Sequence, residues 1–304
     1  MTFQRTIATH RFTLFGALAV GLVLWLTDRR LDDQALLGML PTGLAIYLTS
    51  ELNNTFALLR ISSRMIGSVL ALLLPMAVSL HPLQPAHAVL LLAVIVFFPL
   101  LASYQRPYIP SLSFLTFLLL GCSALFVPQF LLLMPLFWMA QLLLRSFSFR
   151  GWVASLLGIW LPGWFAFSYC YLTDQPEVFL ERCSQVVMLA PPSYEALTLH
   201  HWLVVGFAFL LYVVAVIDFG LNSGRDKTRI RNSYMVVTLL GGAGFAGLMI
   251  QPQLFNELLP LCLVPTAILG GHYIALSYGR LQNWLTIFFL LSSIAISIFN
   301  AFFD

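Results

Sequence analysis

Charged residues are scarce in this chain. Asp, Glu, Lys and Arg make up 9% of its 304 residues, whereas a soluble domain carries roughly 25%. A soluble fold of this length needs a surface that hydrogen-bonds to water, and so little charge argues against one. Apolar residues reach 60%, and the mean hydropathy is +0.90. The composition therefore predicts an integral membrane protein built of helices.

Lysine is almost absent, and paired cysteines are missing. Only Lys227 among the 15 basic residues is a lysine, and no basic run is long enough to follow a nucleic-acid backbone. We therefore expect no nucleic-acid partner. None of the four cysteines belongs to a C-x-x-C pair, so nothing indicates a zinc site or a thioredoxin-like motif. A phosphate loop ending in Gly-Lys-Ser/Thr is also missing. No motif identifies a cofactor.

Eleven apolar segments account for most of the chain. They cover residues 12–27, 35–49, 65–80, 88–104, 111–127, 130–144, 152–172, 202–219, 234–250, 258–278 and 284–303. Several are shorter than the ~20 residues that cross a bilayer without tilt, and flanking Arg, Tyr and Trp side chains can extend them. Because no soluble domain separates them, we expect one transmembrane domain over residues 1–304. Its fold is an all-α transmembrane helix bundle.

Basic residues indicate the orientation, because cytoplasmic loops are enriched in Lys and Arg. With eleven spans, the N-terminus in the cytoplasm and the C-terminus outside, 12 of the 15 basic residues are cytoplasmic. If the segments on either side of Pro128 and Gln129 are fused into one span, only 6 are cytoplasmic. The charge count thus favours a break at Pro128 and the eleven-span topology.

Ionisable and polar side chains at membrane depth need an explanation. His272 lies within segment 258–278 beside Gly270 and Gly271, which allow another helix to approach closely. It is a candidate for a proton relay or a substrate contact, and the simpler interpretation is a neutral histidine hydrogen-bonded to a neighbouring helix. For Gln141 we expect an interhelical hydrogen bond, and for Asp218 a partner in the basic loop that follows it.

The polar segment 50–60 is the best internal binding candidate. It places Glu51, Asn53, Asn54 and Arg60 between two apolar stretches. This pattern predicts a re-entrant or interfacial turn at the cytoplasmic mouth of the bundle. The alternative is simple helix capping by one of the two asparagines.

Acidic and histidine residues gather on the outer side. The short loop after the first segment carries Asp28, Asp32 and Asp33. A carboxylate in such a loop can act as a general base, as in membrane glycosyltransferases that use lipid-linked sugars. Four of the six histidines and nine of the twelve acids fall outside under this topology. Their spacing matches no metal-binding pattern, so we expect a solvated surface and no metal site.

The inner loop 222–232 is the most basic part of the chain. Its cations are Arg225, Lys227, Arg229 and Arg231. Anionic lipid headgroups attract such a segment at roughly 1 kcal/mol per cation. We therefore expect the loop to bind anionic headgroups of the lipid bilayer and to fix the topology.

Small residues and cysteines lead to three further expectations. Stretch 241–247 predicts a close helix contact through the pairs Gly242/Ala246 and Ala243/Gly247. Residues 177–189 predict an interfacial helix in the longest outer loop. Cys170 and Cys183 share the oxidising side, so a disulfide between them is possible, although the sequence fixes the position of neither.

Two stretches in the first half of the chain carry a family resemblance. One is LNNTFALLRI at 52–61. The other runs from SYQR at 103–106 through LGC at 120–122, FVPQF at 126–130 and PLFW at 135–138 to RSFSFR at 145–150 and LPGWF at 161–165. Together they resemble an uncharacterised family of polytopic inner-membrane proteins from Bacteroidota. The resemblance implies a bacterial inner membrane and assigns no activity and no residue role.

Three functions remain open at this level. The leading hypothesis is an accessory subunit in cell-envelope assembly or transport, because no catalytic constellation is visible. The second is a glycosyltransferase with Asp28, Asp32 or Asp33 as base. The third is a small-solute transporter that uses the turn at Glu51 to Asn54 together with His272.

Overall fold

The computed structural model describes residues 3–27, 32–187, 191–195 and 197–303, and every regular element within them is a helix. Seven helices are long and apolar enough to cross a membrane. They are Asp33–Phe56, Pro85–Ala102, Phe149–Leu172, Leu199–Arg225, Thr228–Ile250, Pro252–Leu276 and Arg280–Phe302. Shorter apolar helices cover Thr13–Leu26, Met65–Met76, Pro110–Phe126 and Pro128–Leu143. These are the lengths and compositions of a membrane-embedded helical protein.

Each of the eleven predicted apolar segments coincides with one of these helices, but some boundaries differ. The largest difference lies in α3 (Asp33–Phe56), which was expected to end at residue 49. It continues through Glu51, Asn53 and Asn54, so these residues are helical and do not form a re-entrant turn. The segment 50–60 was misjudged because Glu51, Asn53 and Asn54 lie on the last two turns of a helix. Asn53 bonds to the loop that follows, and Asn54 bonds to Glu51.

The helical chain is interrupted where the sequence predicts a break. Helix α7 (Pro110–Phe126) is followed by Val127, whose backbone is extended, with φ −132° and ψ 95°. The 3-10 helix η3 (Pro128–Leu133) and α8 (Met134–Leu143) come next. A proline lacks a backbone N–H and disfavours the helical conformation of the residue before it, which explains the interruption.

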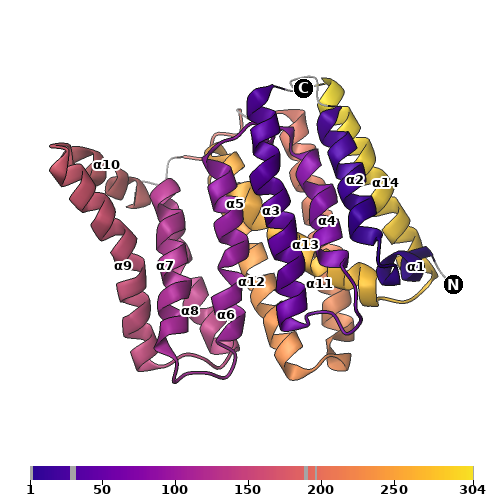
Figure 1. Cartoon of the computed structure of the whole chain (residues 1–304), viewed down its shortest axis with the longest axis horizontal. Helices are drawn as coiled ribbons and strands as arrows, with labels where there is room; N and C mark the ends of the chain where they lie inside the picture. Colours follow the sequence, from indigo (N-terminus) through magenta and orange to yellow (C-terminus); the bar gives the residue numbers. More distant parts are fainter. Residues whose placement is uncertain (1–2, 28–31, 188–190, 196, 304) are drawn as a thin grey trace. The chain divides into compact units, whose positions relative to one another are not determined.

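The chain divides into two compact units, so the single domain expected over residues 1–304 contains both of them. The first unit comprises Met1–Leu91 with Ser193–Asp304, and the second comprises Leu92–Pro192. The boundary falls within α5 (Pro85–Ile95). Figure 1 shows the helices of each unit.

The first unit is built around α13 (Phe255–Leu276), whose most apolar stretch is 94% buried. Three helices pack against α13: α4 (Met65–Leu73), α11 (Leu199–Asn222) and α12 (Thr228–Ile250). The other helices of this unit are α1 (Phe3–Thr9), α2 (Thr13–Leu26), α3, α14 (Arg280–Phe303) and the beginning of α5. A helix that is apolar on all sides and enclosed by others is the expected core of a membrane bundle.

Glycines allow the helices around α13 to approach closely. A Cβ added to Gly271 would lie 2.6 Å from the Cα of Ile66 in α4, and one added to Gly244 in α12 would lie 2.7 Å from the carbonyl oxygen of Leu261. The close approaches expected at Gly271 and in stretch 241–247 are therefore confirmed. The tightest contacts of the stretch are made by Gly241 and Gly244, not by the two predicted pairs.

The second unit contains α6 (Phe97–Ala102), α7, α8, α9 (Phe149–Leu172) and α10 (Pro176–Val187). Helices α7 and α9 form its main contact, and a Cβ on Gly158 would collide with the carbonyl oxygen of Phe114. The amide nitrogen of Gln141 in α8 donates to the hydroxyl of Ser113 in α7 over 3.0 Å. The interhelical hydrogen bond predicted for Gln141 is confirmed, as is a helix in the loop at 177–189.

Candidate functional site

The loop between α3 and α4 is held in a defined shape by Asn53. Helix α3 ends because Ala57 adopts a left-handed conformation, with φ 48°. The buried Asn53 side chain donates to the Ser63 carbonyl over 2.9 Å and accepts from the Leu59 amide over 3.1 Å. One side chain thereby fixes both sides of the loop. Asn53 was predicted as a binding residue, and these hydrogen bonds show that it also shapes the loop.

Arg60, in the same loop, takes part in a buried ionic cluster with Asp226 and His272. Its Nε lies 2.8 Å from Oδ1 of Asp226, and Nε2 of His272 lies 3.3 Å from Oδ2 of the same carboxylate. The Asp226 side chain is fully buried, whereas that of Arg60 is 34% exposed. Arg60 also donates through Nη1 to the Arg225 carbonyl over 3.1 Å. The three ionisable side chains come from three separate parts of the sequence.

Aromatic rings enclose the inner end of this cluster. The ring of Tyr234 meets that of His272 edge-on, with centroids 4.3 Å apart, and Phe219 contacts both rings. The Tyr234 hydroxyl donates to the Leu58 carbonyl over 3.4 Å. These rings keep water from His272, so its imidazole is available to Asp226 and not to solvent.

The Asp226 carboxyl has a pKa below its ordinary value of 3.8. Burial acts to raise this pKa, but the hydrogen bond from His272, its charge and the charge of Arg60 together outweigh burial. Asp226 is therefore a carboxylate at neutral pH. It offsets the charge of Arg60 and holds the guanidinium in place.

A polar cavity of about 540 Å³ is lined in part by Arg60. Its described lining residues are Thr9, His10, Arg11, Asn53, Asn54, Ala57, Leu59, Arg60, Ile61, Ser62, Ser63 and Arg64. We call it the arginine chamber. Three of these residues are arginines and none is acidic. Within the described part of the chain, neither Arg11 nor Arg64 forms an ion pair with a carboxylate.

The N-terminal helix closes one side of the arginine chamber. The side-chain amide of Gln4 in α1 donates to the carbonyls of Ile274 and Ser277 at the end of α13, each over 3.0 Å. The Thr13 hydroxyl at the start of α2 donates to the carbonyls of Ile7 and His10. These contacts fix the bend between α1 and α2 against the bundle, and the bend carries the residues that line the chamber.

Sequence reasoning identified part of this site and missed Asp226. Arg60 and His272 were both predicted as binding residues, and the structure joins them through this one carboxylate. Asn54 lines the chamber and donates to the Glu51 carboxylate over 3.1 Å. Asp226 was overlooked because it lies among four cations in a loop assigned to lipid headgroups. A single acidic residue in an otherwise basic loop was the available sign that Asp226 pairs with residues outside the loop.

Asp32 and Asp33 lie apart from this site, whereas Asp218 is close enough to His272 to interact with it electrostatically. Asp32 caps α3 by accepting from the Ala35 amide over 2.8 Å, and Asp33 lies exposed in its first turn. Asp28 lies outside the described residues. Asp218 accepts from Asn222 over 3.0 Å. His272 lines neither the arginine chamber nor any of the three other pockets described here.

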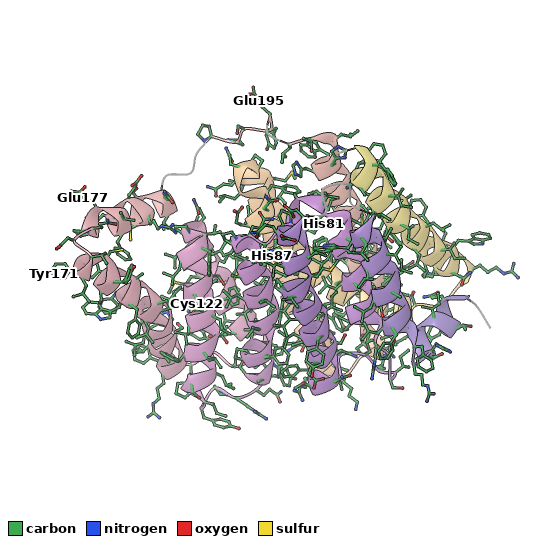
Figure 2. All side chains as sticks on the ribbon, turned by 45° about the horizontal axis from the view of Figure 1, so that its top comes forward. His81, His87, Cys122, Tyr171, Glu177 and Glu195 are labelled. Atoms are coloured by element: carbon green, nitrogen blue, oxygen red, sulfur yellow. The ribbon has the colours of Figure 1, made fainter. Side chains whose placement is uncertain are left out.

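The histidines expected on the outer side contact the protein itself. His81 stacks on Trp25 with ring centroids 3.9 Å apart, and His87 lies beside it in the same unit (Figure 2). His200 contacts Asn300, with Nδ1 3.2 Å from the side-chain oxygen. In the described residues no group of three or more His, Cys, Asp or Glu side chains is close enough to hold a metal ion.

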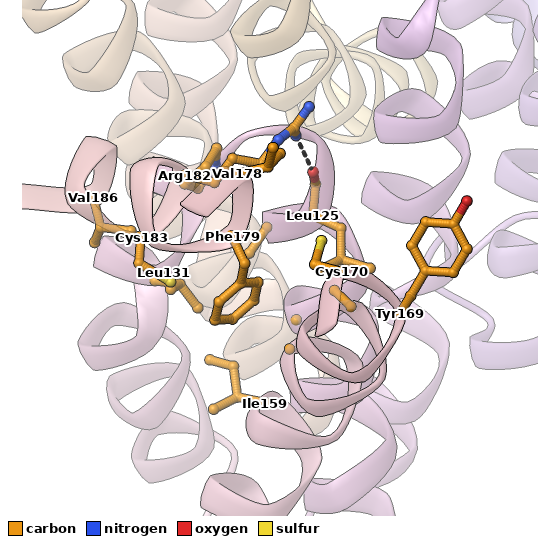
Figure 3. A pocket seen from close by; sticks show the side chains of 15 residues that line it. Leu125, Leu131, Ile159, Tyr169, Cys170, Val178, Phe179, Arg182, Cys183 and Val186 are labelled. Carbon is orange, nitrogen blue, oxygen red and sulfur yellow. Dashed lines mark hydrogen bonds between the residues drawn. The ribbon is translucent and has the colours of Figure 1, made fainter. Parts of the chain in front are cut away.

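The second unit has an apolar pocket of about 300 Å³ between α7, α9 and α10 (Figure 3). Cys170 and Cys183 both line it as free thiols, so the structure shows no disulfide between them. Arg182 lies at the pocket and donates to the Leu125 carbonyl over 2.9 Å. With its one cation occupied and an otherwise apolar lining, this pocket is a weaker candidate than the arginine chamber.

Comparisons with known proteins add no function. No protein-family model matches the chain, and neither a curated protein nor a solved structure is similar to it. The functional argument therefore rests on the arginine chamber.

Proposed function

We propose that this chain is a multi-pass protein of the bacterial inner membrane that binds an anionic group in the arginine chamber, at its cytoplasmic end. This function fits the accessory subunit that was the leading hypothesis from the sequence. The observation that carries the proposal is a polar cavity with three arginines and no acid among its described lining residues. Such a lining attracts anions and repels cations.

The arginines differ in how they are held. Arg60 is fixed by Asp226 and the Arg225 carbonyl, so it presents a preset guanidinium edge. Arg11 and Arg64 have no carboxylate partner among the described residues. A phosphate or carboxylate entering the chamber therefore meets one ordered donor and two that can adapt. Guanidinium groups bind phosphate oxygens in pairs, which favours a phosphate group.

The cytoplasmic placement follows from the positive-inside rule, and the structure supports it. Arg60 contacts the Arg225 backbone, and Thr9 to Arg11 line the same chamber. Gln4 in α1 donates to the Ser277 carbonyl at the end of α13. Three basic segments assigned to the cytoplasm thus meet at one end of the first unit. Their meeting at one end agrees with the proposed topology, in which all three segments are cytoplasmic.

Binding of inorganic pyrophosphate to the purified protein in an uncharged maltoside detergent tests this function. We expect pyrophosphate to raise the thermal midpoint of the wild type in a concentration-dependent way, because a ligand that binds only the folded state stabilises it. Arg64→Gln should weaken binding by about tenfold, equivalent to about 1.4 kcal/mol. Arg150→Gln removes an exposed arginine from the second unit and is the matched control.

Absence of any pyrophosphate effect on the wild type would overturn the proposal. An equal loss in Arg64→Gln and Arg150→Gln would reduce the effect to general charge screening and would also contradict it. The accessory role has its own test, since it expects co-purification with a partner protein in mild detergent. A stable lone monomer with no partner would argue against that part.

A further inference from the structure

An apolar cavity adjoins the arginine chamber in the first unit. Its volume is about 610 Å³, and α1, α2, α4 and α14 supply its walls. Its described lining residues are Thr6, Ile7, His10, Phe12, Thr13, Gly16, Ala17, Val20, Met65, Ser68, Val69, Leu72, Leu290, Leu291 and Ile294. We call it the apolar groove. It contains no acidic residue and no Lys or Arg among these residues.

The chamber and the groove meet at three places. His10 lines both. Arg11 of the chamber lies over the ring of Phe12 of the groove, with its guanidinium carbon 4.8 Å from the ring centroid. Arg64 of the chamber directly precedes Met65 of the groove. The cationic arginine chamber therefore borders directly on the apolar groove, with residues adjacent in sequence lining one and then the other.

Two hydroxyls of the groove, those of Thr13 and Ser68, bond to backbone carbonyls. Thr13 donates to the carbonyls of Ile7 and His10, and the Ser68 hydroxyl donates to the Arg64 carbonyl over 3.0 Å. These two hydroxyls already donate to backbone carbonyls, so neither has a free donor to offer a ligand. The groove thus suits a hydrocarbon chain and not a polar solute.

The groove also opens on the surface that would face lipid. Leu291, one of its lining residues, is 63% exposed, and Phe12 is 52% exposed. Large exposed apolar side chains such as these face acyl chains when the helices lie in a bilayer. A lipid could enter the groove sideways from the membrane without passing through water.

Building on the anion binding proposed above, we infer that the natural ligand is a phosphate-bearing membrane lipid. Its phosphate occupies the arginine chamber, and one hydrocarbon chain lies in the apolar groove. Charge complementarity selects the phosphate, while the shape of the groove selects the chain. The hydrocarbon chain of the lipid moves from the bilayer into the groove, and both are apolar, so the hydrophobic effect contributes little to binding. Packing against the walls of the groove must supply the preference for the bound position.

A glycine pair provides a matched test. A Cβ on Gly16 meets nothing within 4 Å, so Gly16→Phe can fill the groove without a backbone collision. Gly43 in α3 is equally free of neighbours and lines a different apolar pocket, beside Trp25 and Ile46. Gly43→Phe is therefore the control with the same substitution. Val20→Phe is the second groove variant if Gly16→Phe fails to fold.

The experiment compares dioleoyl phosphatidic acid with inorganic pyrophosphate in the same detergent, measured by native mass spectrometry and thermal shift. We expect Gly16→Phe to weaken binding of the lipid by about tenfold and to leave pyrophosphate binding unchanged. Arg64→Gln should weaken both ligands, and Gly43→Phe neither.

Each other outcome has one meaning. If pyrophosphate binds and Gly16→Phe retains the lipid as tightly as the wild type, the hydrocarbon chain does not lie in the apolar groove. Only the anion binding proposed above then remains. If lipid loss is the same in Gly16→Phe and Gly43→Phe, the groove is likewise excluded. If neither ligand binds the wild type, anion binding itself fails and the lipid inference fails with it.

Discussion

Asp226 links the basic loop 222–232 to the interior of the first unit. Its neighbours Arg225 and Lys227 are exposed, but its own side chain turns inward to Arg60 and His272. An arginine facing two further arginines across a cavity is disfavoured by like-charge repulsion. The buried Asp226 carboxylate offsets that repulsion by pairing with Nε of Arg60. The rest of the guanidinium remains available to the arginine chamber.

We expect Asp226→Asn to destabilise the protein by about 1–3 kcal/mol. The substitution keeps the shape of the side chain but removes the charge that Arg60 and His272 face. A fully buried broken ion pair costs about 3–5 kcal/mol, and the expected loss is smaller because water reaches the partly exposed Arg60. The thermal midpoint in maltoside detergent measures the loss. Glu177→Gln, an exposed carboxylate in α10, is the control and should leave the midpoint unchanged.

The pH dependence of this difference checks its electrostatic origin. The Asp226 pKa is lower in the folded protein than its ordinary value of 3.8, so the folded state binds this proton more weakly than the unfolded state. The stabilisation is therefore complete above the ordinary pKa and is lost as the pH falls through the depressed one. The gap between wild type and Asp226→Asn should be full at about pH 6 and shrink below about pH 4. A gap that stays constant to low pH would show a packing effect instead.

Residue chemistry alone identified two of the three ionisable members of this cluster, Arg60 and His272. Arg60 and His272 attracted attention because an ionisable side chain near apolar sequence is costly. Their partner could not be assigned, because Asp226 is 46 residues from His272 and the nearest cations in the sequence offered a simpler pairing. Pairing across helices depends on which loops meet, and the pattern of one chain does not contain that information.

At the scale of helices, the packing of α13 against α4 depends on Gly271. An added Cβ there would lie 2.6 Å from the Ile66 Cα and 2.8 Å from its amide nitrogen, both of them backbone atoms. Gly271→Ala should therefore push the two helices apart and destabilise the protein by about 1–3 kcal/mol. Gly206→Ala in α11, where a Cβ meets nothing within 4 Å, is the control.

Thermal midpoints of both variants in the same detergent measure the effect. Gly206→Ala should match or slightly exceed the wild type, because alanine is the better helix former. A Gly271→Ala midpoint equal to that of the wild type would mean that α4 and α13 do not pack as closely as the structure shows.

The sequence predicted the existence of the apolar helices better than their ends. Length and hydropathy suffice to find a segment such as Thr228–Ile250, because lipid contact demands a long apolar run. The end of α3 was misjudged because Glu51, Asn53 and Asn54 resemble a loop in composition. Asn53 is held by hydrogen bonds to residues 59 and 63, and Asn54 donates to Glu51 within the helix. Hydropathy does not reflect such contacts.

For the whole molecule, the exposed surface agrees with a bilayer environment. Helix α9 is the least enclosed of the long apolar helices, with 17% of its most apolar stretch buried. Trp160, Trp164 and Phe165 on it are each more than half exposed. In water such a face would aggregate, whereas in lipid it needs no protein cover.

The topology can be tested at the one point where the charge argument is decisive. If α7 and α8 cross the membrane separately, every segment after Pro128 has the orientation opposite to that of a single fused span. A reporter fused after Arg231 should then read cytoplasmic, and one fused after Glu177 should read extracytoplasmic. A reporter after Arg106 is the internal control, because it reads cytoplasmic under either arrangement. Reversed signals after Arg231 and Glu177, with the control unchanged, would exclude eleven spans. They would also place the basic loop 222–232 outside the cell, where the positive-inside rule gives no reason for its four cations.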